Sequence, residues 1–103
     1  ETLYCPGSVN GKATASRIQA NIVKAVRTDV KDRGIKEGWY RMDVPGRVDF
    51  PGDKNGDEVP DAFLANTKCV GIIVEPFFMK EFEKAKLYQN IVARAIAQAC
   101  LPK

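Results

Sequence analysis

The sequence predicts a small α+β domain in which a mostly antiparallel sheet is packed with one N-terminal helix and a second, C-terminal helix. Two observations lead to this class. Apolar residues recur at helical spacing near both ends of the chain, and short β-prone runs separated by turn residues lie between them. At 103 residues, 45% of them hydrophobic, the chain has the length of one compact domain, so we expect a single domain over residues 1–103.

The N-terminal third is predicted to hold a strand and a helix. Residues 1–13 are rich in proline, glycine and asparagine, which favours a strand or hairpin at a sheet edge. A helix is expected from an N-cap at Thr14 or Ser16 to a stop at Gly34. Its apolar face consists of Ile18, Ile22, Val23, Val26 and Val30.

The middle of the chain is predicted to be extended. Two short strands, 39–44 and 47–50, are separated by a Pro-Gly pair, and a polar loop follows over 51–61. The run TKCVGIIVE at 67–75 is continuously β-prone and has the length of a central strand. Cys69 lies inside this run, so we expect it to be a free, buried thiol.

A second helix is predicted over 78–99, where apolar residues recur at three and four residues and alanines are frequent. It would carry Cys100 back toward Cys5. A bridge between these two cysteines would close a loop of about 95 residues and contribute roughly 4 to 5 kcal/mol in the chain-entropy model. The alternative is three unrelated buried thiols.

Secretion is the predicted localisation, and the site of action can differ from it. Oxidised cysteines are typical of chains that leave the cytosol. The sequence also starts at Glu1 without a methionine or an apolar leader, which suggests that a signal peptide has been removed. No run approaches eighteen apolar residues, so we expect no membrane span.

The chain has no histidine, and this absence argues against an enzyme. Imidazole-activated nucleophiles, histidine acid/base catalysis and histidine zinc sites are all excluded. We therefore expect no catalytic residue, no cofactor and no metal. The alternatives are a secreted toxin or inhibitor, or a small hydrolase or nuclease whose cleft gathers carboxylates and arginines such as Arg41, Asp43 and Glu75.

Charge is distributed unevenly along the chain. Residues 12–36 hold seven basic and two acidic side chains, whereas residues 43–61 hold two basic and six acidic ones. On the first helix, Arg17, Lys24, Arg27 and Lys31 are predicted to form a basic ridge beside the apolar face. Such opposite patches can orient a partner, or can be ordinary solvated faces.

The basic ridge is a candidate surface for RNA or for a protein partner. Trp39, Tyr40 and Arg41 lie nearby in sequence, and cations with aromatic rings are the groups that bind phosphates and stack on bases. The competing interpretation is a solvated helix face with aromatic residues in the core. We expect the protein to be a monomer.

The acidic segment DKNGDEVPD places Asp53, Asn55, Asp57 and Asp61 at spacings that resemble a calcium loop. It lacks the glycine expected after Asp57 and the final glutamate of such loops. A surface turn is therefore favoured over a calcium site or an acidic partner-binding loop.

The densest apolar cluster consists of Phe77, Phe78, Met79 and Phe82. It lies at the predicted junction between a strand and a helix. Part of it must be core, and the rest can form an exposed patch for a protein partner.

The order of elements resembles that of small secreted fungal proteins of the microbial-ribonuclease-like class. The likeness rests on Leu3-Tyr4-Cys5-Pro6-Gly7, the helix around 18–30, the Trp39-Tyr40 strand, the 69–74 strand and a terminal cysteine. It is closest to the catalytically inactive ribonuclease-like effectors of powdery mildew fungi. Tyr4 is adjacent to Cys5 rather than two residues before it, and the chain ends in a predicted helix where that family has a strand.

The resemblance implies a bridge between the N-terminal and C-terminal cysteines. It also implies a non-enzymatic secreted effector, a virulence protein of a plant pathogen, that enters host cells and binds a host protein or RNA. A host immune receptor is one such protein partner. Active members cleave RNA with histidine, glutamate and arginine, so no catalytic set carries over to this chain.

Overall fold

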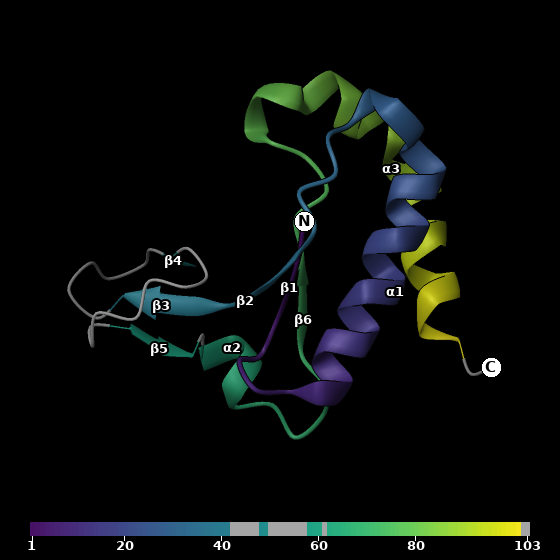
Figure 1. The fold of residues 1–103 in the computed structure, drawn as a ribbon. Coiled ribbons are helices and arrows are strands. Elements are labelled where there is room, and N and C mark those ends of the chain that lie inside the picture. Colours follow the sequence, from purple (N-terminus) through teal and green to yellow (C-terminus); the bar gives the residue numbers. More distant parts are fainter. Residues whose placement is uncertain (42–47, 50–57, 61, 102–103) are drawn as a thin grey trace.

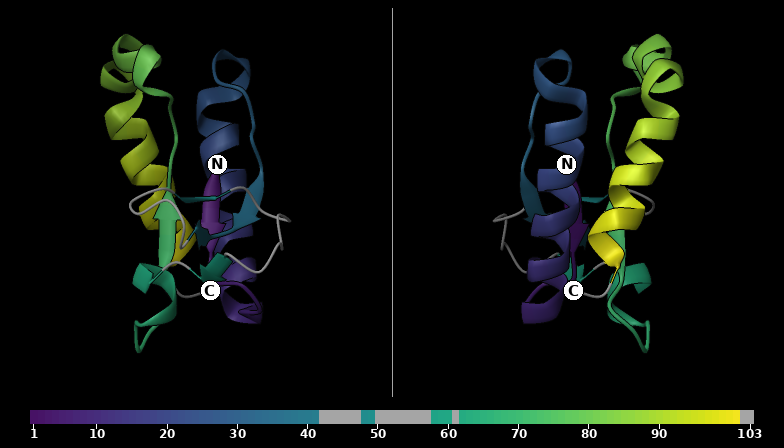
Figure 2. Two further views of the ribbon diagram at one scale, coloured as in Figure 1. Left: turned by 90° about the vertical axis from the view of Figure 1, so that its left-hand side faces the viewer. Right: turned by 90° about the vertical axis from the view of Figure 1, so that its right-hand side faces the viewer.

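The computed structural model describes residues 1–41, 48–49, 58–60 and 62–101. Two long helices lie side by side on one face of a three-stranded sheet, and a second small sheet extends away from the helices (Figures 1 and 2). The predicted α+β class, with an N-terminal and a C-terminal helix, is therefore confirmed. The main sheet is mixed rather than mostly antiparallel.

The first sheet has β1 (Thr2–Tyr4) in its centre. It pairs in parallel with β2 (Ile35–Glu37) and antiparallel with β6 (Ile72–Val74). The first residues thus form the central strand rather than an edge strand, and the run at 67–75 supplies only a short edge strand, so both predictions of strand position are wrong.

A local turn keeps the start of the 67–75 run out of the sheet. The Thr67 hydroxyl donates a hydrogen bond to the Cys69 carbonyl oxygen at 2.7 Å and lies 3.4 Å from the Leu64 carbonyl oxygen. Polar turn chemistry of this kind competes with strand pairing. Cys69 is consequently exposed, which corrects the expectation of a buried thiol.

The second sheet consists of β3 (Trp39–Arg41) between β4 (Val48–Asp49) and β5 (Glu58–Pro60). All its pairings are antiparallel, and the register sets Trp39 opposite Asp49. The two strands predicted on either side of the Pro-Gly pair therefore exist and pair, while their connection lies outside the described residues. A four-residue helix, α2 (Ala62–Ala65), follows β5.

Helix α1 (Val9–Val26) begins earlier than predicted. Its N-cap is Ser8, whose hydroxyl oxygen accepts a hydrogen bond from the Gly11 backbone N–H at 2.9 Å, so the expected cap at Thr14 or Ser16 is wrong. Glycine at 11 permits this start, because a Cβ there would lie 2.8 Å from the Ser8 Oγ. Gly7, at a φ of +80°, makes the turn that precedes the cap.

Helix α1 also ends earlier than the predicted stop at Gly34. A single 3-10 turn, η1 (Arg27–Asp29), follows it, and Val30 is already extended. The break occurs at Arg27, whose φ of +53° is incompatible with a continuing right-handed helix.

Helix α3 (Phe82–Cys100) confirms the predicted C-terminal helix, although it starts four residues later. A 3-10 turn, η2 (Met79–Glu81), leads into it. Two reciprocal bonds hold this turn: the Phe78 N–H donates to the Glu81 carboxylate at 3.0 Å, and the Glu81 N–H donates to the Phe78 carbonyl at 2.9 Å.

The hydrophobic core lies between the two helices and the first sheet. Its buried members are Ile18, Ile22, Val26, Val92, Ala95 and Ala99. Burying each of the larger side chains contributes on the order of 1.5–3 kcal/mol. Ala95 and Ala99 of α3 face α1 and let the two helix backbones approach closely.

A polar network joins the central strand to the helix layer. Thr2 is completely buried, and its hydroxyl donates to the Gln19 amide oxygen at 2.9 Å. The Gln19 amide nitrogen donates to the Asp32 carboxylate at 2.7 Å, and the Gly34 N–H donates to the same oxygen at 2.8 Å. These two hydrogen bonds lower the pKa of Asp32 below its ordinary value.

The first residue is held by ionic contacts. The Glu1 carboxylate pairs with Arg33 at 3.1 Å and with Lys36, and the Glu1 ammonium donates to the Glu75 carbonyl oxygen at 2.8 Å. Partial burial raises the pKa of the Glu1 carboxyl, but the Lys36 hydrogen bond and the two positive charges outweigh it and leave the pKa lowered.

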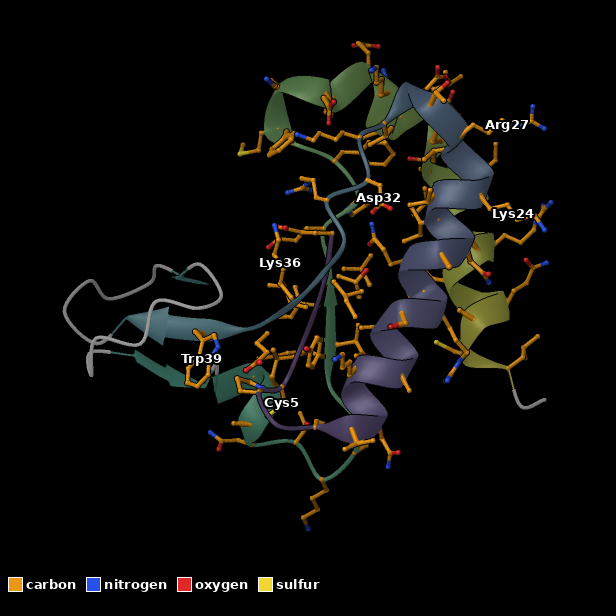
Figure 3. The ribbon with its side chains drawn as sticks, viewed as in Figure 1. Cys5, Lys24, Arg27, Asp32, Lys36 and Trp39 are labelled. Atoms are coloured by element: carbon orange, nitrogen blue, oxygen red, sulfur yellow. The ribbon has the colours of Figure 1, made fainter. Side chains whose placement is uncertain are left out.

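The expected bridge between Cys5 and Cys100 is not supported by the structure. Cysteines can be bridged only when their Cα atoms lie within about 7 Å. Helix α1 lies between the turn that holds Cys5 and the C-terminal end of α3 (Figures 1 and 3), and all three cysteines are free thiols. The end-to-end placement in sequence therefore does not become proximity in space.

Replacing Gln19 by leucine tests the polar network. Gln19→Leu leaves the buried Thr2 hydroxyl without its acceptor, so we expect the free energy of unfolding to fall by about 1–3 kcal/mol. The pKa of Asp32 is lower in the folded state than in the unfolded state. Its contribution to the free energy of unfolding is therefore present above the unfolded-state pKa and is lost as the pH falls through the folded-state pKa. In urea unfolding, the free energy of unfolding should fall less below about pH 4 in the variant than in the wild type.

Gln89→Leu is the matched control, because Gln89 is an exposed glutamine on α3. It should change the unfolding free energy by no more than about 0.5 kcal/mol. Equal effects of the two substitutions would contradict the role given to Gln19.

Candidate nucleic-acid interface

Helices α1 and α3 run antiparallel, and side chains link them along their length. Arg17 Nε donates to the Ala99 carbonyl oxygen at 3.3 Å, and Asn21 Nδ2 donates to the Ala95 carbonyl oxygen at 3.2 Å. Arg17 thus satisfies one of the carbonyls that the C-terminal end of α3 leaves without a helical partner.

At the other end of the pair, the Tyr88 hydroxyl donates to the Asp29 carboxylate, and Lys84 Nζ donates to the Asp29 carbonyl oxygen at 2.6 Å. The bond to Asp29 raises the pKa of Tyr88. These links set the register in which residues of the two helices face each other.

The outer side of this helix pair forms a groove, which we call the cationic groove. Its volume is about 390 Å³. It is lined by Asn21, Lys24, Ala25, Arg27, Ile91, Arg94, Ala95 and Gln98. Three cations and two amides therefore surround a small apolar floor, and no carboxylate is among the lining residues.

A second cavity extends the cationic groove toward the C-terminal end of α3. It has a volume of about 340 Å³ and shares Asn21 and Gln98 with the first. Arg17 lies on its wall. The row from Arg17 to Arg27 spans ten residues along α1, or about 15 Å at helical rise.

The groove is electropositive because little negative charge lies near it. Helix α1 contains no aspartate or glutamate, and α3 contains none after Glu83. The salt bridges found in the described parts of the chain join Arg33 and Lys36 to Glu1 and involve none of the groove cations. Neighbouring like charges without counter-ions attract anions.

Arg27 occupies the groove in a strained backbone conformation. Its φ of +53° and ψ of −130° suit glycine, and a non-glycine residue there costs about 1–3 kcal/mol. Strained backbone of this kind clusters at functional sites, so the outlier marks the end of α1 as a candidate site.

Only part of the predicted basic ridge lies along the groove. Arg17, Lys24 and Arg27 lie along the groove, as shown for Lys24 and Arg27 in Figure 3. Lys31 follows η1, is exposed and does not line the groove, because the helix expected to carry it ends at Val26.

Arg94 joins the groove from α3 and was not among the predicted site residues. Its signal in the sequence is weak: it is a single cation within the alanine-rich second half of the C-terminal helix. The absence of carboxylates from residues 84–103 is the feature that could have pointed to it.

The aromatic residues predicted to accompany the ridge lie elsewhere. Trp39 and its neighbours Tyr40 and Arg41 form β3 of the second sheet, on the side of the first sheet away from the helices (Figure 3). The structure therefore does not bring the basic ridge and the aromatic strand together into one surface.

Several of the other predicted site residues lie outside the part of the chain that the structure describes. Asp53, Asn55, Asp57 and Asp61 lie outside the described residues, as does Asp43 of the alternative catalytic cleft. Among the residues that are described, no group of three or more carboxylates and cysteines is arranged to hold a metal ion. No helix in this part of the chain is long and apolar enough to cross a membrane.

Comparison with known proteins yields no relative for this chain. No family model matches it, and no curated protein and no solved structure is significantly similar to it. The ribonuclease-like effector family is therefore still a prediction from the sequence.

Two substitutions at Arg27 separate its backbone strain from its charge. Arg27→Gly and Arg27→Ala both remove the guanidinium, but only glycine relieves the strain at a φ of +53°. We expect the glycine variant to be more stable than the alanine variant by about 1 kcal/mol or more in urea unfolding. Equal stabilities would show that this backbone position carries no strain.

Proposed function

We propose that this protein is a non-enzymatic module that binds RNA through the cationic groove, in the manner of a secreted effector that acts on a host. One observation carries the proposal: Lys24 near the end of α1, Arg27 directly after it and Arg94 from α3 line a single groove, and none of the described lining residues is a carboxylate. The groups arranged in this way suit phosphates, whose binding by lysine and arginine dominates affinity for nucleic acids.

A strand of nucleic acid fits the groove better than an isolated phosphate does. The row of polar and basic groups extends for about 15 Å along α1, a length over which one strand presents several phosphates. The amides of Asn21 and Gln98 add hydrogen-bonding groups between the cations. The described part of the groove lining contains no aromatic side chain, so we expect contacts to the sugar-phosphate backbone and little sequence preference.

The same lining supports a binding role rather than a catalytic one. RNA cleavage by acid/base chemistry needs a group that accepts the proton of the attacking hydroxyl. The groove offers ammonium, guanidinium and amide groups, and the whole chain lacks histidine. Action in a host cell is proposed from the sequence resemblance.

The test is to measure the binding of a labelled single-stranded RNA of about twenty nucleotides by fluorescence anisotropy at a series of salt concentrations. Three phosphate contacts give a slope of about −2 for log K against log salt, so affinity should fall roughly twentyfold between 50 and 200 mM. Arg94→Gln should weaken binding and bring the slope closer to zero by about 0.7.

Lys12→Gln is the matched control for Arg94→Gln. It also removes one positive charge, and Lys12 is exposed on α1 but is not among the groove residues. Equal losses of RNA affinity in the two variants would refute binding in the groove. They would indicate diffuse attraction by the net charge instead. Cleavage of the RNA that the Arg94 substitution abolishes would refute the non-enzymatic role.

A further inference from the structure

A second groove lies on α3 and is apolar, and we call it the apolar groove. Its main cavity has a volume of about 390 Å³ and is walled by Phe77, Phe82, Val92 and Ile96, with Lys86 as the single charged group among its lining residues. An adjoining cavity of about 290 Å³ shares Phe77 and Phe82 with it. The two cavities form one continuous depression.

The apolar groove and the cationic groove occupy opposite sides of α3. Helix positions advance by about 100° per residue, which places Phe82, Gln89 and Ile96 about half a turn away from Ile91 and Arg94. The apolar side faces the segment that leaves β6, the edge strand of the first sheet. A ligand in the apolar groove would therefore leave the cationic groove free.

The apolar groove opens directly onto the hydrophobic core. Val92 is buried at its floor, and Phe77 stacks against Tyr88 with ring centroids 6.5 Å apart. At its rim, Met79 is 99% exposed, Phe82 64% and Phe78 45%. Large apolar groups gathered at this level of exposure are typical of interaction sites rather than of a bare monomer surface.

The rim of the groove is positively charged. Arg33 lies 4.1 Å from the centre of the Phe78 ring, Lys80 lies 5.7 Å from the same ring, and Lys86 lies 5.6 Å from the centre of the Phe82 ring. Cations at these distances are attracted by the ring faces. Arg33 is already paired with Glu1, so Lys80 and Lys86 are the cations that favour negative charge in whatever binds beside the rings.

The carboxylate of Glu81 is held by the η2 turn, where it accepts a hydrogen bond from the Phe78 backbone N–H. Glu81 is not among the described residues that line either cavity. The charged group in that lining is Lys86, and Lys80 lies over the adjoining Phe78 ring.

We propose that the apolar groove is a docking site for a short segment of a protein partner that carries two large apolar side chains flanked by carboxylates. Each cavity has room for one large side chain, and the carboxylates pair with Lys80 and Lys86 at the rim. Apolar anchors in a groove supply most of the affinity, and rim charges add orientation and association rate.

The test is a selection from a phage-displayed library of random twelve-residue peptides on the wild-type protein, with counter-selection on Phe82→Ser. We expect the enriched peptides to share two large apolar residues with aspartate or glutamate beside them. The most enriched peptide is then synthesised, and its affinity is measured by anisotropy. Phe82→Ser should weaken binding at least tenfold, and Lys86→Glu should weaken it by a similar factor.

Leu87→Ser is the matched control. Leu87 is also a large apolar residue, 71% exposed on the same helix, but it is not among the described residues that line the apolar groove. It should change peptide affinity less than twofold, and thermal unfolding followed by circular dichroism verifies that each variant is folded. Failure to enrich acidic apolar peptides, or equal effects of Phe82→Ser and Leu87→Ser, would overturn the proposal.

Two further measurements separate the alternative occupants. Binding to vesicles of phosphatidylcholine and phosphatidylserine, lost in Phe82→Ser, without peptide enrichment would assign the groove to a lipid surface instead. Light scattering that shows a Phe82-dependent dimer would assign it to a second copy of the chain. RNA affinity should be unchanged in Phe82→Ser, so this proposal and the proposed function succeed or fail separately.

Discussion

The placement of β1 between β2 and β6 is the constraint on which the rest of the fold depends. A three-residue strand makes few ladder hydrogen bonds, so its position is secured by contacts outside the sheet. Thr2 is completely buried beneath α1 and bonded to Gln19, and the ionic contacts of Glu1 hold the strand's other neighbour, the segment around Glu75. A buried hydroxyl without a partner costs free energy, so this bond also specifies which face of α1 meets the sheet.

Because both long helices cover the same face of that sheet, α3 is left with two unlike surfaces. One faces outward beside α1 and collects cations from both helices, while the other faces the end of β6 and consists of aromatic and aliphatic side chains. A helix packed between two layers would have neither surface open. The arrangement therefore creates two grooves with different chemistry, separated by the width of one helix.

The cationic groove contains two features that are locally unfavourable. Like charges are gathered without counter-ions, and Arg27 adopts a backbone conformation that suits glycine. Sequences usually agree with their local structure, and departures concentrate at functional sites. The exposed aromatic rings at the other groove are a departure of the same kind, although Arg33, Lys80 and Lys86 partly cover them.

The sequence by itself determined the features that follow from local spacing and composition. The periodicity of Ile18, Ile22 and Val26 and the alanine-rich run before Cys100 predict the two helices and the faces that meet in the core. Turn residues predict the paired strands of the second sheet, and the spacing of Lys24 and Arg27 predicts that both lie on one side of the first helix. These features depend on neighbours within one or two helical turns.

Only the tertiary structure decided which distant elements meet. The central position of β1, the exposure of Cys69, the separation of Cys5 from Cys100 and the addition of Arg94 to the cationic groove all depend on long-range packing. Strand order and helix register are set by the sum of many weak contacts across the core, and spacing along one segment does not encode that sum. Trp39 lies apart from the basic helix for the same reason. Although it is close to that helix in the sequence, this closeness does not determine which sheet it joins or on which side of the molecule it lies.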